Sequence, residues 1–101
     1  MEFSGFDWDG GNVEKCRKHG VSVTDIENLF GRAVAIVPTE PHSDAAGRFV
    51  AVARTPEGRA LFVVFTLRQR GSAVLLRPIS ARFMHEKEIA SYERENPNLP
   101  K

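Results

Sequence analysis

The segment of residues 59–68 constrains the fold of this 101-residue chain more than any other. In strand alternation both of its sides are apolar, one carrying Leu61, Val63, Phe65 and Leu67 and the other Ala60, Phe62 and Val64. A strand that is apolar on both sides lies inside a sheet whose two faces are covered. The chain therefore needs neighbouring strands for this segment and further elements on both faces.

Segments with strand character lie on both sides of residues 59–68. Residues 48–55 precede it across Pro56-Glu57-Gly58, which is typical of a tight turn, so the two segments predict an antiparallel hairpin. Residues 73–82 follow it and contain Pro78, which cannot donate to a strand ladder and indicates a bulge or a free edge. A shorter strand is predicted at residues 33–37, and the composition of residues 38–47 is that of a loop.

Three helices are predicted outside these strands. The first begins at Asp9 or Asn12, either of which can cap it, and stops before Gly20. Ser22 can cap a second helix, and a third is expected over residues 84–96. The order predicts an α+β fold in which two N-terminal helices and one C-terminal helix cover a four-stranded antiparallel sheet.

Composition limits the classes of protein open to the chain. With 42% hydrophobic and 27% charged residues it matches a folded domain, and we expect one domain over residues 1–101. The longest apolar run, residues 60–65, is far shorter than the roughly 20 residues of a membrane span. No secretory signal is present either, so we expect a cytoplasmic protein without membrane contact. Cys16 is the one cysteine and the histidines are scattered, so we expect no disulfide, no metal site and no cofactor.

Arginines recur inside the predicted strands, at Arg54, Arg68, Arg77 and Arg82. The formal charge of +1 is too small for bulk attraction to nucleic acid, so their positions matter more than their number. Each could be an exposed residue that protects a sheet edge. Four together indicate an anion-binding face, because a guanidinium group matches two oxygens of a phosphate or carboxylate.

Several short motifs follow one another in the order and spacing of a known family. They are Phe6-Asp7-Trp8-Asp9, Gly11-Asn12, Lys15-Cys16-Arg17-Lys18-His19-Gly20-Val21-Ser22, Arg48-Phe49, Arg54-Thr55, Arg77-Pro78-Ile79-Ser80-Ala81-Arg82, and Glu88 followed by Tyr92. On these residues the chain resembles the BrnT family, the toxins of bacterial type II toxin-antitoxin pairs. The resemblance implies a RelE-like fold and a ribonuclease activity that arrests growth. It also implies a BrnA-like ribbon-helix-helix antitoxin, and binding to operator DNA only through the complex of the two proteins.

Cleavage of RNA without a metal uses the ribose 2′-hydroxyl as nucleophile, and it needs a base, a group that stabilises the phosphate and an acid. His19 leads the candidates for proton transfer, because an imidazole exchanges protons near neutral pH. Beside a helix end and a glycine, the same ring could instead cap a free carbonyl. Arg54 and Arg82 are expected to stabilise the phosphate, since strands hold side chains rigidly.

The remaining candidates carry two interpretations each. Tyr92 could stack on a base or supply a hydroxyl, as the resemblance implies, or it could pack in the core. The predicted RNA-binding set is Lys18, Thr66, Arg68, Arg77 and Ser80. Lys18 could equally be a solvated helix-end cation, and Ser80 could bond neighbouring backbone. Glu88 is expected to pair with a basic neighbour rather than act as a base, and His85 is assigned no role.

Two classes of function fit these residues. The first is an endoribonuclease toxin that works by general acid-base catalysis with arginines on the phosphate. The second is a non-catalytic module whose arginine face docks a protein partner or RNA. A cationic groove attracts both RNA and an acidic antitoxin segment, so the two classes remain open at this point.

Overall fold

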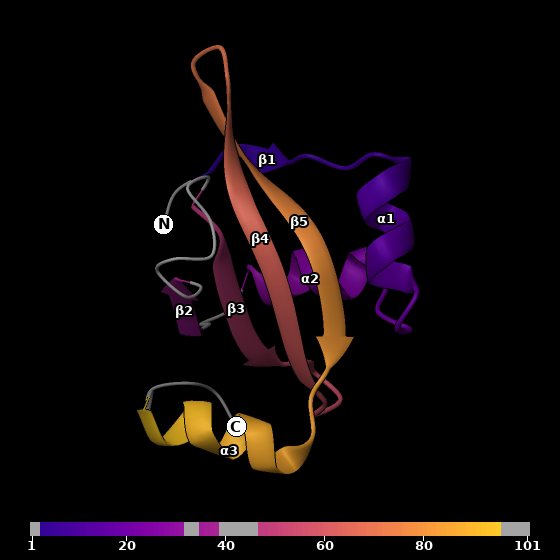
Figure 1. Ribbon diagram of the computed structural model, residues 1–101, viewed down its shortest axis with the longest axis vertical. Coiled ribbons are helices and arrows are strands. Elements are labelled where there is room, and N and C mark those ends of the chain that lie inside the picture. The colour runs from indigo at the N-terminus through magenta and orange to yellow at the C-terminus, as the bar shows by residue number, and fades with distance from the viewer. Residues whose placement is uncertain (1–2, 32–34, 39–46, 96–101) are drawn as a thin grey trace.

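The computed structural model describes residues 3–31, 35–38 and 47–95, which form three helices and one sheet (Figure 1). The helices are α1 (Gly10–Arg17), α2 (Val23–Leu29) and α3 (Glu86–Glu95). The strands are β1 (Gly5–Phe6), β2 (Ala35–Pro38), β3 (Phe49–Arg54), β4 (Ala60–Arg70) and β5 (Ala73–Phe83). The α+β class and the order of the predicted elements are confirmed.

The sheet differs from the prediction in one strand. Its order is β1-β5-β4-β3-β2, and β1 runs parallel to β5, so the sheet is mixed with five strands rather than antiparallel with four. The backbone holds β1 in place, because the N–H of Ser4 donates to the carbonyl of Val74 at 2.7 Å and that of Asp7 to the carbonyl of Leu76 at 2.9 Å. A strand of two residues has no alternation that a sequence pattern could show.

The helices cover opposite faces of the sheet, as the doubly apolar central strand requires. On one face, α1, α2 and the turn between them contribute Cys16, Val21, Ile26 and Leu29 to a cluster with Ala51, Ala53, Leu61, Val63, Phe65, Leu76 and Ala81. On the other face, Ile89 of α3 is buried with Val50, Val52 and Ala60, and Phe62, Val64, Met84 and Tyr92 surround them. Figure 1 shows α3 across one end of the sheet and α2 behind the strands. Any site on the sheet is therefore bordered either by the α1–α2 pair or by α3.

Pro78 marks an irregularity in the β4–β5 pair, as predicted. Val64 pairs with Ser80 while Phe65 pairs with Pro78, so Ile79 is the extra residue of a bulge on β5. The proline itself is fully buried. The bulge therefore lies between the Arg77 and Arg82 positions of the same strand.

Both predicted caps of the first helix take part in one capping box. The Asp9 carboxylate accepts hydrogen bonds from the backbone of Gly11 and Asn12, and the Asn12 side chain accepts one from the backbone N–H of Asp9 at 2.7 Å. The Asn12 amide also donates to the carbonyl of Pro78 at 2.8 Å. This buried side chain thus both caps α1 and attaches it to β5.

The described helices are too short and too polar to cross a membrane. The third helix begins at Glu86, two residues later than predicted, and the second ends at Leu29. Most of the predicted loop over residues 38–47 lies outside the described residues.

Candidate functional site

Arg54 lies at the end of β3 on the α3 face, where carboxylates of α3 surround it. Its Nε and Nη2 donate to Glu93 at 2.9 and 3.2 Å, and both Nη atoms donate to Glu86 at 3.1 and 2.9 Å. Nη1 also donates to the carbonyl of Gly58 at 2.9 Å. A guanidinium has five N–H donors, so these bonds use all of them. In this arrangement Arg54 fastens α3 to the sheet and has no donor left for a phosphate.

Arg82 lies on the same face and is more accessible. Its two Nη atoms donate to the two carboxylate oxygens of Glu88 at 3.1 and 2.9 Å, and its guanidinium carbon lies 4.5 Å from the centroid of the Phe62 ring. The side chain is 42% exposed. Its other three donors have no partner among the described residues. Arg82 is therefore oriented by one carboxylate and one ring while keeping donors toward solvent.

In the Arg82–Glu88 pair each residue shifts the pKa of the other. Hydrogen bonds from Arg82, and then from the backbone N–H of His85, lower the pKa of Glu88 to about 2. The hydrogen bonds that Arg82 donates to Glu88 raise the pKa of Arg82, and Tyr92 is near enough to add slightly to that rise. Near neutral pH the pair is thus a closed ion pair. The expectation that Glu88 pairs with a basic neighbour is confirmed.

Tyr92 lies one turn after Glu88 on α3 and is half-buried against the cluster around Ile89. Its ring packs at the sheet face, as the core interpretation of this residue expected, and it lies close enough to Arg82 to raise the pKa of that arginine slightly. Ser80 is half-buried two residues before Arg82, opposite Val64 in the ladder. Arg54, Arg82, Tyr92 and Ser80 therefore share one face of the sheet.

His19 and Lys18 are not part of that group. They follow α1 in the turn that leads to α2, and both are exposed. The α1–α2 pair covers the face opposite to α3, so the structure does not bring His19 together with Arg54 and Arg82. The turn is set by Gly20, whose φ of 82° suits glycine and whose N–H donates to the carbonyl of Arg17. A sequence shows that a turn is present but not which layer carries it.

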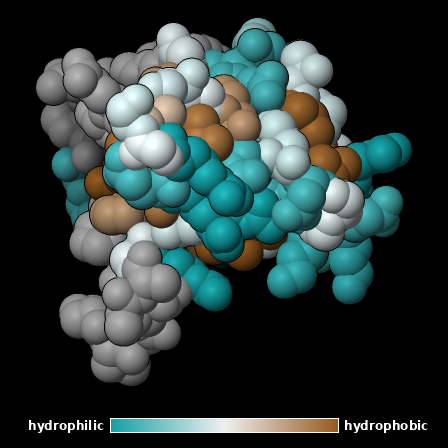
Figure 2. Space-filling model, turned by 90° about the horizontal axis from the view of Figure 1, so that it is seen from above, coloured by the Kyte–Doolittle hydropathy of each residue, from teal (hydrophilic) through white to brown (hydrophobic). Residues whose placement is uncertain are grey.

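The other predicted RNA-binding residues lie toward the β4–β5 hairpin. The Thr66 hydroxyl donates to the carbonyl of Gly47 at 3.2 Å, and Arg68 is exposed on β4. Arg77 donates to the Asp9 carboxylate at 2.8 Å and is only 18% exposed. Seen from the hairpin end, hydrophilic residues gather over the hairpin and again over α1 at the right of the view (Figure 2). None of these three side chains adjoins Arg82 directly in the ladder.

His85 is the residue at this site that the sequence did not single out. It is exposed at the start of α3, its backbone N–H donates to Glu88 at 3.1 Å, and its charge contributes to the lowered pKa of Glu88. The structure thus places an imidazole, other than the predicted one, beside the Arg82–Glu88 pair. Its position three residues after Arg82 could have indicated this, because a helix that begins directly after a strand keeps its first residues near the end of that strand. No group of three or more metal-ligating side chains occurs among the described residues.

The fold and this site define a small α+β protein with an oriented arginine and titratable side chains on a sheet face. The model of the family described as "Ribonuclease toxin, BrnT, of type II toxin-antitoxin system" matches residues 8–88. The chain belongs to this family, as its motifs predicted. It is therefore a ribonuclease toxin with an RNA target and an antitoxin partner. No curated protein matches the chain.

Proposed function

We propose that this toxin is a metal-independent endoribonuclease that binds the scissile phosphate at Arg82, on the face of the sheet that α3 borders. The observation that carries this proposal is the contrast between the two strand arginines. Arg54 uses all five donors within the protein, whereas Arg82 is 42% exposed and keeps three. A bound phosphate needs such free donors, so Arg82 is assigned to the phosphate and Arg54 to the position of α3.

Binding of RNA at Arg82 is an exchange of anions. Glu88 now occupies two parallel donors of the guanidinium, and a phosphate can take the same two donors in the same geometry. The remaining donors of Arg82 then reach the oxygens on which negative charge develops during cleavage. Phe62 beneath the guanidinium keeps its plane fixed throughout.

Proton transfer at this site is assigned to His85, with the hydroxyl of Tyr92 as the second candidate. His85 adjoins the carboxylate that the phosphate displaces, so its ring can lie close to the reacting 2′-hydroxyl or the leaving 5′-oxygen. His19, the candidate that the sequence favoured, belongs to the layer on the other face of the sheet. The geometry therefore supports His85 over His19.

The test is RNA cleavage by the purified protein in the presence of EDTA, with product ends analysed by mass spectrometry. We expect cleavage to continue and to leave a 2′,3′-cyclic phosphate and a 5′-hydroxyl, because the 2′-oxygen is the nucleophile. Loss of cleavage in EDTA would overturn metal independence. Absence of any cleavage by the wild-type protein would favour the non-catalytic binding module.

The matched substitutions His85→Gln and His19→Gln assign the proton-transfer group. Both remove one exposed imidazole, so they change charge and surface equally. We expect His85→Gln to abolish the bell-shaped dependence of cleavage on pH between about pH 5 and pH 8, and His19→Gln to preserve it. The reverse pattern would move the catalytic role to His19.

We also propose that the antitoxin is a ribbon-helix-helix protein and that it neutralises the toxin by covering Arg82 with an acidic or apolar segment. The same charge that attracts RNA attracts such a segment. Operator DNA is then bound only by the complex, through the antitoxin. We propose a RelE-like classification of the fold and a cytoplasmic site of action, where the RNA is. A titration of RNA cleavage with the purified antitoxin tests the occlusion, since full inhibition at one antitoxin site per toxin is expected.

A further inference from the structure

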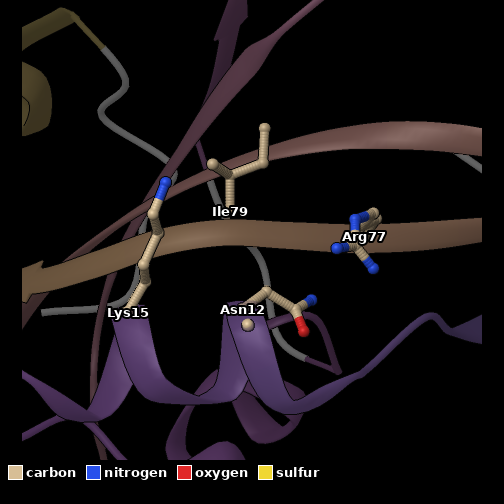
Figure 3. Close-up of a pocket in the computed structure, with 5 residues that line it drawn as sticks. Asn12, Lys15, Arg77 and Ile79 are labelled. Carbon is tan, nitrogen blue, oxygen red and sulfur yellow. The ribbon is translucent and has the colours of Figure 1, made fainter.

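A hollow of about 210 Å³ lies between α1 and β5 (Figure 3). Gly11, Asn12 and Lys15 line it from α1, and Arg77 and Ile79 line it from β5. Figure 3 shows the Lys15 side chain projecting from the helix across β5 toward Ile79. The hollow therefore has a lysine on one side and an arginine at its end.

A second hollow, of about 420 Å³, adjoins the first. It is lined by Glu14, Lys15, Arg17 and Lys18, so Lys15 belongs to both. We call the two together the α1–β5 groove. The groove carries four cationic side chains and one carboxylate among these lining residues.

The cations at the end of α1 differ from Arg54, Arg77 and Arg82 of the sheet in having no ion-pair partner among the described residues. Lys15, Arg17 and Lys18 are exposed and have no ion-pair partner within the described ranges 3–31, 35–38 and 47–95. An anion that binds them displaces no carboxylate of the protein. The α1 side of the molecule is also hydrophilic in Figure 2.

Arg77 is held in position at the end of the groove. Its Nη2 donates to Asp9 at 2.8 Å, and its Nη1 lies 3.5 Å from both the carbonyl and the carboxylate of Asp7. Its Nε has no partner among the described residues. The two aspartates therefore fix the guanidinium while one of its edges stays open to the groove.

A simpler role for the α1 cations is to complement the helix dipole, which favours positive charge in the last turn. Lys15 and Arg17 occupy that turn and Lys18 is its C-cap, so all three fit this explanation. The Lys15 side chain also extends from α1 across β5, where it lines the hollow together with Arg77 and Ile79 (Figure 3). The helix dipole does not account for Arg77, which lies on β5 and lines the same groove.

We propose that the α1–β5 groove binds phosphates of the same RNA strand that Arg82 holds at the cleavage site. Arg77 and Arg82 belong to one strand and pair with Thr66 and Phe62, which are four residues apart on β4 because Ile79 is a bulge residue; at about 3.3 Å per residue the two arginines lie roughly 13 Å apart along the strand. That length corresponds to about four stacked nucleotides at roughly 3.4 Å each. Flexible lysines suit successive phosphates that vary in position, since each acts as a point charge. This inference rests on the proposed site at Arg82.

The test measures binding of a 2′-O-methyl RNA oligonucleotide, which cannot be cleaved, by fluorescence anisotropy at several KCl concentrations. The variant is Lys15→Gln with Lys18→Gln, and the control is Lys87→Gln with Arg94→Gln, which removes two exposed cations of α3. All four positions are exposed, and circular dichroism verifies that each variant folds. The slope of log K against log salt is negative, and we expect its magnitude to fall by about 1.4 in the groove variant, at about 0.7 per lost phosphate contact, and to stay unchanged in the control.

Three outcomes overturn the inference. An equal fall in slope in both variants would mean that only net charge matters, and no fall in either would mean that RNA does not touch the groove. Unchanged RNA binding together with lost binding to a polyglutamate peptide would assign the groove to an acidic protein partner. If the wild-type protein cleaves RNA in any of these cases, the proposed ribonuclease site stands and the groove alone is refuted. A wild-type protein that does not cleave refutes the proposed function instead.

Discussion

The bond between Arg54 and Glu93 should hold α3 more strongly than the bond between Arg54 and Glu86. Glu86 contributes most to raising the pKa of Arg54, but its side chain is 77% exposed, so water screens the pair. Arg54 and Glu93 are 16% and 13% exposed, and their hydrogen bonds lie largely out of water. Hydrogen bonds of charged groups contribute about 1.5–3 kcal/mol, so we expect a coupling of about that size for this pair.

A double-mutant cycle measures this coupling. Arg54→Met, Glu93→Gln and the double variant are unfolded in urea, and the free energies of unfolding are combined so that effects of each single change cancel. The parallel cycle with Glu86→Gln is the control, and its coupling should be much smaller. Equal couplings in the two cycles, or none between Arg54 and Glu93, would refute the assignment of Arg54 as the anchor of α3.

Three further predictions follow from single features of the structure. The pKa of Glu88 is depressed to about 2 in the folded state, so the stability it contributes is present above its unfolded value near 4.5 and is lost as the pH falls toward 2. The difference in melting temperature between wild type and Glu88→Gln should therefore narrow from pH 6 to pH 3, and a constant difference would contradict the Arg82–Glu88 pair. Gly20→Ala should lower the free energy of unfolding, measured in urea, by about 1–2 kcal/mol, because a φ of 82° is unfavourable for any residue with a Cβ. No neighbouring atom would meet the added methyl group, so the loss reports the backbone conformation alone. An unchanged free energy of unfolding would count against this turn. Cys16 is fully buried and burial raises its pKa, so its thiol should react with a disulfide reagent only in denaturant, and rapid reaction of the folded protein would contradict the packing of α1.

Strand positions could be predicted because alternation and turn residues are local signals. The doubly apolar segment became the central strand β4, and Pro78 marked the bulge. The short strand β1 could not be predicted, since its stability comes from backbone bonds to β5, nearly 70 residues later in the chain. The register Val52↔Phe62↔Arg82 explains why Arg54 and Arg82 share a face, and alternation alone gives this face only once the register is known.

The candidate site was predicted less completely than the fold. The sequence proposed Arg54 and Arg82 alike for the phosphate, because the saturation of Arg54 depends on carboxylates 32 and 39 residues away, which no local pattern reveals. His19 was favoured over His85 because it lies in a motif, although the layer that carries it faces away from Arg82. The sequence predicted the position of α3 but not its orientation against the sheet. That orientation determines both which carboxylates surround Arg54 and which histidine lies near Arg82.

The most direct test of the account is single-turnover cleavage of RNA by Arg82→Gln, compared with the wild-type protein at equal stability. Arg82 is 42% exposed, so the substitution should leave the fold intact. If Arg82 stabilises the charge that develops on the phosphate, the rate of cleavage should fall by about 10²–10³-fold, as for loss of one oxyanion donor. A variant that is folded and cleaves at the wild-type rate would contradict the location of the site.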